Sequence, residues 1–227
     1  MPHQLIYTHP DFYVFNKTQG VDFHDDNGVA GFFSQIKHSY PSEKLYPVHR
    51  LDKETSGLII VARNLAAEQY IQQLFQASKI EKYYWAIAGN KPKQKQGRIC
   101  GDMKKSRNKG WMLAKRTDNP AKTYFYSFGL GNGYRHYLLK PYTGKTHQLR
   151  VAMKSIGSPI LGDDIYKGQS ADRLYLHAQA LRIHYQQQII EVQLNPEHPL
   201  FKIANANATD ENKKWINAPW SLNWPKL

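Results

Sequence analysis

One carboxylate in this chain of 227 residues stands in a sequence setting suited to chemistry. Asp52 lies within the run His49-Arg50-Leu51-Asp52-Lys53-Glu54-Thr55-Ser56-Gly57, and the apolar run Leu58–Ala62 that follows predicts a buried strand. An aspartate between an arginine and a Thr-Ser-Gly turn at the start of a strand is placed for nucleophilic or acid/base work. Taken alone, the pattern fits a turn residue that caps the loop equally well, so both interpretations stay open on these residues.

Other familiar sets of reactive residues are missing from the sequence. Gly144-Lys145-Thr146 ends like a phosphate-binding loop, but Leu139 stands where such a loop needs glycine. One cysteine cannot build a thiolate zinc site, and the ten histidines form no His-Glu-x-x-His pair. No Gly-x-Ser-x-Gly elbow is present. The sequence therefore predicts neither a metal ion nor a cofactor, and Asp52 is left as the best candidate for a reactive group.

The elements that must position Asp52 are strands and helices in irregular alternation. The apolar patterns predict strands over 5–7, 12–15, 58–62, 83–88, 123–128, 134–140, 174–183 and 188–194. They predict helices around Phe32–Ile36, from about Leu65 to Ser78 with Asn64 as N-cap, and from Thr146 to Ile156. Because no steady βαβ rhythm appears, the sequence favours an α+β fold with a mixed, largely antiparallel central sheet flanked by helices and loops.

The charge of the chain indicates a polyanionic partner. The net charge is +13, and residues 91–122 hold eleven Lys and Arg against two Asp, or +9 of that total. A basic surface favours nucleic acid or an anionic membrane. No apolar run approaches the roughly 20 residues that span a bilayer, and the first residues do not resemble a signal peptide. The single cysteine, Cys100, fits a reducing compartment, so we expect a cytoplasmic protein that binds nucleic acid rather than a membrane.

The run His49–Gly57 resembles the catalytic motif of the RluA-type pseudouridine synthases, which isomerise uridine within RNA. Lys82-Tyr83 stands where that family has a Lys-x-Tyr or Lys-Tyr element. The run Thr143–Val151 is similar to the family's Thr-Gly-Arg-Thr-His-Gln-Ile/Leu-Arg-Val segment. Ser158–Tyr166 and Leu174–Ala178 resemble its last two blocks, so the matches run in order from about residue 12 to 185.

The resemblance implies a pseudouridine synthase fold with an RNA-binding cleft across the sheet, and an isomerase that needs no cofactor. It implies that Asp52 is the catalytic aspartate, that Arg150 pairs with it, and that Tyr83 stacks on the target base. An arginine beside a carboxylate keeps the carboxylate ionised and fixes its direction. Arg50 would enter the RNA stack in place of the flipped uridine. We expect RNA contacts from His49, Arg50, Thr55, Lys82, Lys145 and His147, and from Lys104, Lys105 and Arg107 of the basic segment.

Two positions depart from the family pattern. The early Asn-Lys-Pro-x-Gly loop appears as Asn16-Lys17-Thr18-Gln19-Gly20, and Ala152 replaces the histidine after Arg-Val. Losing proline removes a fixed φ angle. Neither change touches Asp52 or Arg150, so substrate fit is affected more than chemistry.

We expect residues 1–227 to form a single catalytic domain and a monomer. It would carry a basic loop or hairpin at about 91–122 and a Trp-rich tail at about 205–227, with no RNA-binding domain ahead of it. The predicted substrate is a uridine in structured rRNA or tRNA, in a stem-loop whose bases can be splayed out. The alternatives are a non-catalytic RNA-binding or chaperone-like protein on the same fold, and a basic enzyme with a small anionic substrate.

Overall fold

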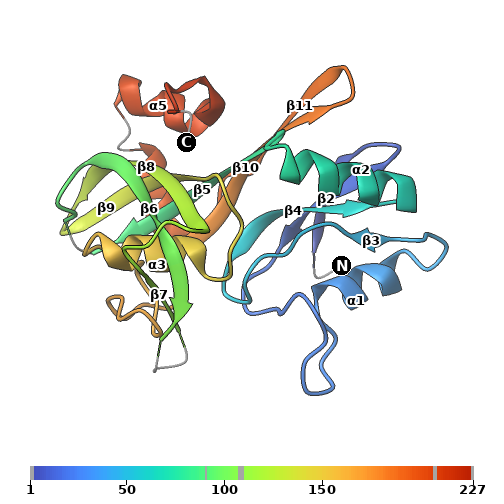
Figure 1. The fold of residues 1–227 in the computed structure, drawn as a ribbon, viewed down its shortest axis with the longest axis horizontal. Coiled ribbons are helices and arrows are strands. Elements are labelled where there is room, and N and C mark those ends of the chain that lie inside the picture. The colour runs from blue at the N-terminus through green and yellow to red at the C-terminus, as the bar shows by residue number, and fades with distance from the viewer. Residues whose placement is uncertain (1–2, 90, 107–109, 207–208, 226–227) are drawn as a thin grey trace. The chain divides into compact units, whose positions relative to one another are not determined.

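The computed structural model describes residues 3–89, 91–106, 110–206 and 209–225 (Figure 1). The chain divides into two compact units. Unit 1 comprises Met1–Ile80 and Ala178–Leu194, and unit 2 comprises Glu81–His177 and Asn195–Leu227. Each unit is described by itself below.

Unit 1 is built on a sheet whose strands run in the order β1-β2-β4-β10, with β3 beside β4 and β11 beside β10. The pairs β1–β2, β2–β4, β3–β4 and β10–β11 are antiparallel. Its elements are β1 (Gln4–Thr8), β2 (Phe12–Lys17), α1 (Phe32–Ser39), β3 (Tyr46–Pro47), β4 (Ser56–Ala62), α2 (Leu65–Gln76), β10 (Leu176–Tyr185), whose first two residues belong to unit 2, and β11 (Gln188–Gln193).

The two helices of unit 1 cover opposite faces of its sheet. Successive side chains of a strand point to opposite faces. Phe12 and Val14 of β2 share a buried core with Ile71 and Leu74 of α2. The intervening Phe15 instead packs its ring against Phe32 of α1, with centroids 6.3 Å apart. The strand that leads out of the Asp52 loop, β4, is therefore buried along its whole length.

Helix α2 begins as its sequence predicts. The side chain of Asn64 accepts a hydrogen bond from the backbone N–H of Ala67 at 2.8 Å, which caps the first turn. The helix ends at Gln76, two residues before the predicted end.

Unit 2 holds an antiparallel sheet in the order β5-β9-β8-β6-β7. Its elements are β5 (Ile80–Ala88), which begins at the last residue of unit 1, β6 (Gln96–Lys105), β7 (Trp111–Leu113), β8 (Pro120–Gly131), β9 (Tyr134–Pro141), α3 (Gln148–Ser155), α4 (Pro199–Ala206), α5 (Asp210–Asn217) and the short 3-10 helix η1 (Pro219–Ser221). The mostly antiparallel strands and few helices confirm the predicted α+β class. Much of the basic segment 91–122 is strand, in β6, β7 and the start of β8.

The Trp-rich tail packs on the sheet of unit 2. Trp215 lies 5.5 Å from Tyr126, and Trp224 lies 4.9 Å from the same ring, measured between centroids. Tyr126 Oη also donates a hydrogen bond to the carbonyl oxygen of Asn223 at 2.9 Å. The helices α4 and α5 were not expected from the sequence. Within the described residues, no helix is both long and apolar enough to cross a membrane.

Candidate active site

The backbone of the loop that carries Asp52 is held by hydrogen bonds from a buried lysine of unit 1. Lys17, at the end of β2, has no solvent exposure. Its Nζ donates hydrogen bonds to the carbonyl oxygens of Thr18 at 3.0 Å, Lys53 at 3.0 Å and Thr55 at 3.1 Å. An ammonium group has three N–H donors, so these three carbonyls use its full capacity. Two of the acceptors directly follow or closely follow Asp52, and the lysine therefore sets the path of this loop.

Burial disfavours the charged form of Lys17. Burial lowers the pKa of Lys17 from 10.5 to about 8, although the carboxylates of Glu54, Asp22 and Asp52 act in the opposite direction. The Asp52 carboxylate therefore lies within the field of a buried cation. Asp52 itself is half-buried, and its carbonyl oxygen accepts a hydrogen bond from Thr55 N at 3.0 Å, which closes the turn.

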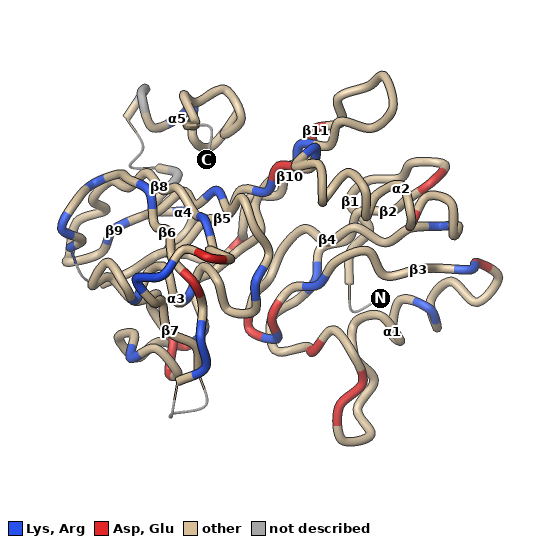
Figure 2. The backbone as a smooth tube through the Cα atoms, viewed as in Figure 1, with Lys and Arg blue, Asp and Glu red and all other residues tan. Residues whose placement is uncertain are grey.

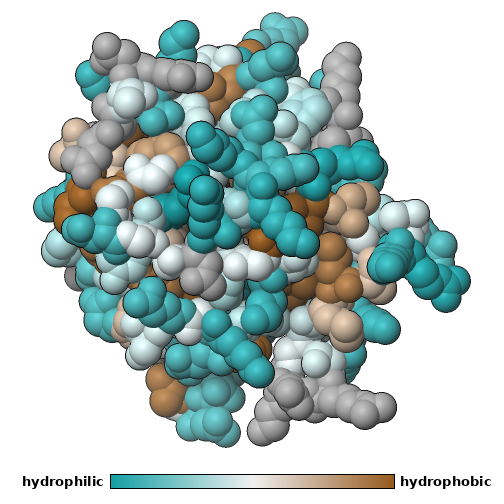
Figure 3. Space-filling model, turned by 90° about the vertical axis from the view of Figure 1, so that its left-hand side faces the viewer, coloured by the Kyte–Doolittle hydropathy of each residue, from teal (hydrophilic) through white to brown (hydrophobic). Residues whose placement is uncertain are grey.

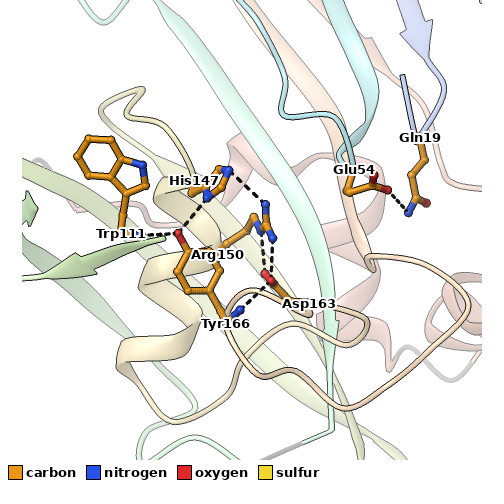
Figure 4. Close-up of polar contacts among 7 residues, drawn as sticks. All are labelled: Gln19, Glu54, Trp111, His147, Arg150, Asp163 and Tyr166. Atoms are coloured by element: carbon orange, nitrogen blue, oxygen red, sulfur yellow. Dashed lines mark hydrogen bonds and ion pairs between the residues drawn. The ribbon is translucent and has the colours of Figure 1, made fainter. Parts of the chain in front are cut away.

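Two further contacts tie the early loop to the Asp52 loop. Gly20 N donates to the carbonyl oxygen of Lys53 at 3.0 Å, and Gln19 Nε2 donates to Glu54 Oε2 at 3.1 Å (Figure 4). The segment Asn16–Gly20, where the family's proline is replaced by Thr18, thus keeps its contacts with the motif through its backbone and through Gln19.

The neighbours of Asp52 in unit 1 have different exposures. Arg50 is exposed, as its predicted role in RNA binding requires. His49 Nε2 accepts a hydrogen bond from the backbone N–H of Ile60 at 2.9 Å, so this ring orders the start of β4. Thr55 is buried. Its burial argues against a direct contact between the Thr55 side chain and RNA, and its carbonyl serves Lys17 instead.

Gly57 is required by the close approach of two strands. Its φ is +111°, and a Cβ there would lie 2.3 Å from the carbonyl oxygen of Ala178 in β10. No larger residue fits this position, which explains the glycine that ends the Asp52 motif.

Arg150, in α3 of unit 2, forms a buried ion pair with Asp163. Its Nε donates to Asp163 Oδ2 at 2.8 Å and its Nη2 to Asp163 Oδ1 at 2.7 Å (Figure 4). The third nitrogen, Nη1, lies 3.3 Å from His147 Nε2. His147 Nδ1 in turn lies 2.9 Å from the hydroxyl of Tyr166. The pairing of Arg150 with Asp52 would join the two units, and it stays a prediction.

Gln148 explains why the Thr143–Val151 segment has its particular sequence. Its buried amide nitrogen donates to Lys122 O and Thr123 Oγ1, both at 3.0 Å. Its amide oxygen accepts from Thr143 Oγ1 at 2.7 Å and from Lys145 N at 3.1 Å. The side chain thereby ties the loop before α3 to β8. Lys145 Nζ donates to the carbonyl oxygen of Asn119 and is half-buried.

The two candidate residues on β5 are in contrasting surroundings. Lys82 is half-buried, and burial lowers its pKa from 10.5 to about 8. Tyr83 has no solvent exposure. Its hydroxyl donates to Glu81, and its ring lies against Trp220 and Trp224 of the tail, with centroids 6.4 and 5.6 Å away. This burial argues against stacking of Tyr83 on an RNA base.

Tyr84 lies on the other face of the same strand. Adjacent residues of a strand point to opposite faces, so the Tyr84 ring does not face the aromatic side of the sheet that the tail covers. Lys82-Tyr83-Tyr84 also satisfies the Lys-x-Tyr form of the family element. The sequence therefore also carries a signal for Tyr84, which is itself buried with 8% exposure, and the assignment of the role to Tyr83 stays a prediction.

The β6–β7 hairpin of unit 2 carries two of the lysines that were predicted to bind RNA. Lys104 and Lys105 are exposed, and Lys105 pairs with Trp111 across the two strands. Figure 2 shows blue segments along this hairpin. The face of the molecule in Figure 3 is largely hydrophilic, with hydrophobic patches between the polar side chains. Arg107, which was predicted to bind RNA with these lysines, lies outside the described residues.

Comparison with known proteins decides the family. The model of the RNA pseudouridylate synthase family matches residues 11–155. The chain belongs to this family. It is 45% identical, over 89% of this chain and 92% of the relative, to an uncharacterized RNA pseudouridine synthase of Haemophilus influenzae. It is 33% identical, over 79% of this chain and 85% of the relative, to the dual-specificity RNA pseudouridine synthase RluA of Escherichia coli.

The fold agrees with this membership. The solved structure of human RNA pseudouridylate synthase domain containing 1 matches with a TM-score of 0.71 and 27% identity, covering 86% of this chain and 83% of the human one. The chain is an RNA pseudouridine synthase of the RluA type, and it converts uridine in RNA to pseudouridine. The enzyme's predicted site residues fall into two groups, one in each unit.

Three residues that support these groups were not assigned roles from the sequence: Lys17, Asp163 and Tyr166. Lys17 and Asp163 both lie in motifs that are visible in the sequence. Lys17 binds backbone carbonyls, and Asp163 binds Arg150, which lies 13 positions away. Such contacts have no periodicity or spacing that a single sequence reveals.

Proposed function

We propose that this RNA pseudouridine synthase uses Asp52 as its catalytic residue and acts on a uridine in structured rRNA or tRNA. The observation that supports Asp52 is its place in a half-buried loop whose backbone is held by the buried ammonium of Lys17. A catalytic group needs a fixed direction, and this loop supplies it through backbone contacts that do not occupy the carboxylate.

The reaction breaks the C1′–N1 bond, turns the uracil and joins C1′ to C5. The hydrogen on C5 leaves to water and N1 gains a proton, so the reaction is redox-neutral. Asp52 acts either on the base, on ribose C1′ or at the ribose 2′ position to give a glycal. In each route the carboxylate must be ionised when the reaction starts.

The RNA class is proposed from charge and from exposed side chains. Arg50 in unit 1 and Lys104 and Lys105 in unit 2 are exposed cations. Contacts from lysine and arginine to phosphate position a protein on RNA without reading its sequence. A relative named for dual specificity supports more than one RNA as substrate. We also propose that the enzyme works in the cytoplasm, because its single cysteine fits a reducing compartment, and that it acts as a monomer.

The test is release of tritium from RNA labelled at uridine C5. The wild-type protein should release tritium to water from rRNA or tRNA transcribed without modification. Asp52→Asn, which keeps the shape of the side chain, should bind the same RNA with unchanged salt dependence and release none. Glu54→Gln, two residues along the same loop, is the matched control and should retain release. Normal release by Asp52→Asn would exclude Asp52 as the catalytic residue.

A non-catalytic RNA-binding protein on this fold would give a different result. It would bind RNA with a strong salt dependence, but neither the wild type nor Glu54→Gln would release tritium from any RNA. Weak RNA binding without a salt slope would instead favour a small anionic substrate.

A further inference from the structure

A chain of hydrogen bonds in unit 2 joins the β6–β7 hairpin to Arg150 (Figure 4). We call residues 102–106 and 110–113 the basic hairpin. The backbone N–H of Trp111 donates to Tyr166 Oη at 3.0 Å. Tyr166 Oη lies 2.9 Å from His147 Nδ1, and His147 Nε2 lies 3.3 Å from Arg150 Nη1. All of these residues belong to one unit.

The types of donor and acceptor fix the direction of this chain. A guanidinium N–H only donates, so His147 Nε2 accepts from Arg150 and carries no hydrogen. The neutral imidazole then carries its hydrogen on Nδ1, which donates to Tyr166 Oη. The Trp111 backbone N–H also only donates. Tyr166 Oη therefore accepts two hydrogen bonds, one from the hairpin and one from the histidine that contacts Arg150.

Tyr166 is also the surface on which the hairpin rests. Gly110 is buried, and a Cβ there would lie 3.1 Å from Ile165 Cγ2 and 3.3 Å from Tyr166 Cε1. The hairpin backbone thus lies directly on the 165–166 turn. Ser106 N donates to Gly110 O at 2.8 Å, which keeps the two strands together at this point. A displacement of Lys104 or Lys105 therefore moves Trp111 relative to Tyr166.

The Arg150 end of the chain is conformationally restricted. Tyr166 N donates to Asp163 Oδ1 at 3.1 Å, so the same residue touches the carboxylate that holds Arg150. His147 adopts a left-handed conformation with φ of 57°, directly before α3. Non-glycine residues adopt this conformation where the surrounding structure holds them in it.

We propose that Tyr166 is a positioning residue that couples contact between RNA and the basic hairpin to the orientation of Arg150. When RNA phosphates engage Lys104 and Lys105, the hairpin seats Trp111 on Tyr166, and Tyr166 holds His147 against Arg150. This proposal rests on the proposed function, because it assigns Arg150 to the catalytic machinery.

The test combines two changes and measures turnover at saturating and at limiting RNA. Tyr166→Phe removes the acceptor but keeps the ring, which lies 5.7 Å from His147 and 5.2 Å from the Arg150 guanidinium. Lys104→Gln with Lys105→Gln removes the phosphate contacts. Tyr175→Phe is the matched control, because it removes the hydroxyl of another buried tyrosine of unit 2, which donates to Asp172 Oδ1 at 2.8 Å. Tritium release gives kcat and KM, and thermal melting gives stability.

Coupling predicts an effect on kcat that is not additive. The lysine changes should lower kcat of the wild type by about fivefold or more, and they should raise KM. Tyr166→Phe alone should lower kcat by about tenfold or more. In the Tyr166→Phe background, the lysine changes should raise KM but lower kcat by less than about twofold. Tyr175→Phe should change the melting temperature without removing the sensitivity of kcat to the lysines.

Additive effects on kcat, or a normal kcat in Tyr166→Phe, would overturn the coupling while leaving the proposed function intact. Absence of tritium release by the wild type on every RNA would overturn both. If Tyr166→Phe does not fold, Gly110→Ala serves instead, since its Cβ would crowd Ile165 and Tyr166 at 3.1 to 3.4 Å and disturb the contact between hairpin and turn. It should reproduce the lowered kcat and the lost sensitivity, and additive behaviour there would again overturn the coupling.

Discussion

Arg150 and Asp163 form a two-point ion pair in the interior of unit 2. Arg150 is 5% exposed and Asp163 is 1% exposed, and both nitrogen–oxygen distances are below 3 Å. This pairing fixes the plane of the guanidinium through Nε and Nη2. Two of the three guanidinium nitrogens are therefore held by Asp163, while the third, Nη1, faces His147 at 3.3 Å. Asp163 is thus a support for the candidate catalytic arginine, whatever the partner in unit 1.

Removing one member of this pair should cost more than removing both. Asp163→Asn leaves Arg150 buried without a full counter-charge, and we expect a loss of about 3–5 kcal/mol in the free energy of unfolding. Urea unfolding at neutral pH measures it. The double variant Arg150→Met with Asp163→Leu should be more stable than Asp163→Asn, yet release no tritium from RNA. Equal stability of Asp163→Asn and wild type would show that leaving Arg150 without its counter-charge costs no stability.

Lys17 should give the enzyme an alkaline limit. Its pKa of about 8 means that the ammonium loses a proton as pH rises through that value, and the neutral amine has only two N–H donors for three carbonyls. We expect kcat to fall above about pH 8. Stability should behave in the opposite way. Between about 8 and 10.5 the unfolded chain binds more protons at this residue than the folded chain, so stability from Lys17 rises with pH.

The control for this prediction is Lys82, because burial also lowers its pKa to about 8. Lys82→Met should keep the alkaline fall in kcat, whereas Lys17→Met should show a low kcat with no further fall. Turnover that stays constant from pH 7 to 9.5 in the wild type would contradict the role of the Lys17 ammonium.

Much of the fold follows from local patterns, while the supports of the site do not. Asn64 caps α2 as predicted, because an N-cap acts on the next three residues. Strand β4 follows from an unbroken apolar run. The start of helix α3 was predicted at Thr146, two residues too early, because His147 takes a left-handed conformation that the spacing of apolar residues does not reveal. The Lys17 and Asp163 contacts depend on tertiary approach, and so does the cover of Tyr83 by Trp220 and Trp224, which belong to a distant segment of the chain.

His136 should make unit 2 sensitive to acid. The residue is fully buried between Trp85 and Phe128, with ring centroids 4.8 and 5.1 Å away. Burial lowers its pKa from 6.5 to about 3. The unfolded chain therefore takes up a proton in this range that the folded chain does not, and stability is lost as pH falls from 6.5 toward 3. The loss should reach about 3–5 kcal/mol.

The substitution His136→Phe removes this titration. Neither ring nitrogen of His136 has a hydrogen-bond partner among the described residues, so the change leaves no broken contact there. Urea unfolding near neutral pH and near pH 4 should show a smaller acid loss for His136→Phe than for the wild type. His38→Gln, at an exposed position, should keep the wild-type loss. An unchanged pH dependence in His136→Phe would place the acid sensitivity elsewhere.

The tyrosine that serves the reaction should be Tyr84, and the adjacent Tyr83 should serve the fold. The Tyr83 ring is held by the tail, and the Lys140 ammonium, paired with Glu81 at 3.2 Å, lies 5.2 Å from its centroid. While the tail stays in place, a base cannot stack on this ring. Tyr83→Leu should therefore lower the melting temperature but leave kcat of the folded protein near that of the wild type. Tyr84→Phe should keep the melting temperature and, if its hydroxyl moves the C5 proton, lower kcat by about 100-fold or more.

The opposite result, a low kcat in Tyr83→Leu and a normal one in Tyr84→Phe, would mean that the tail leaves Tyr83 when RNA binds. Tryptophan fluorescence of Trp220 and Trp224 on RNA addition distinguishes these cases independently of turnover, because a tail that stays in place keeps both indoles packed on the sheet.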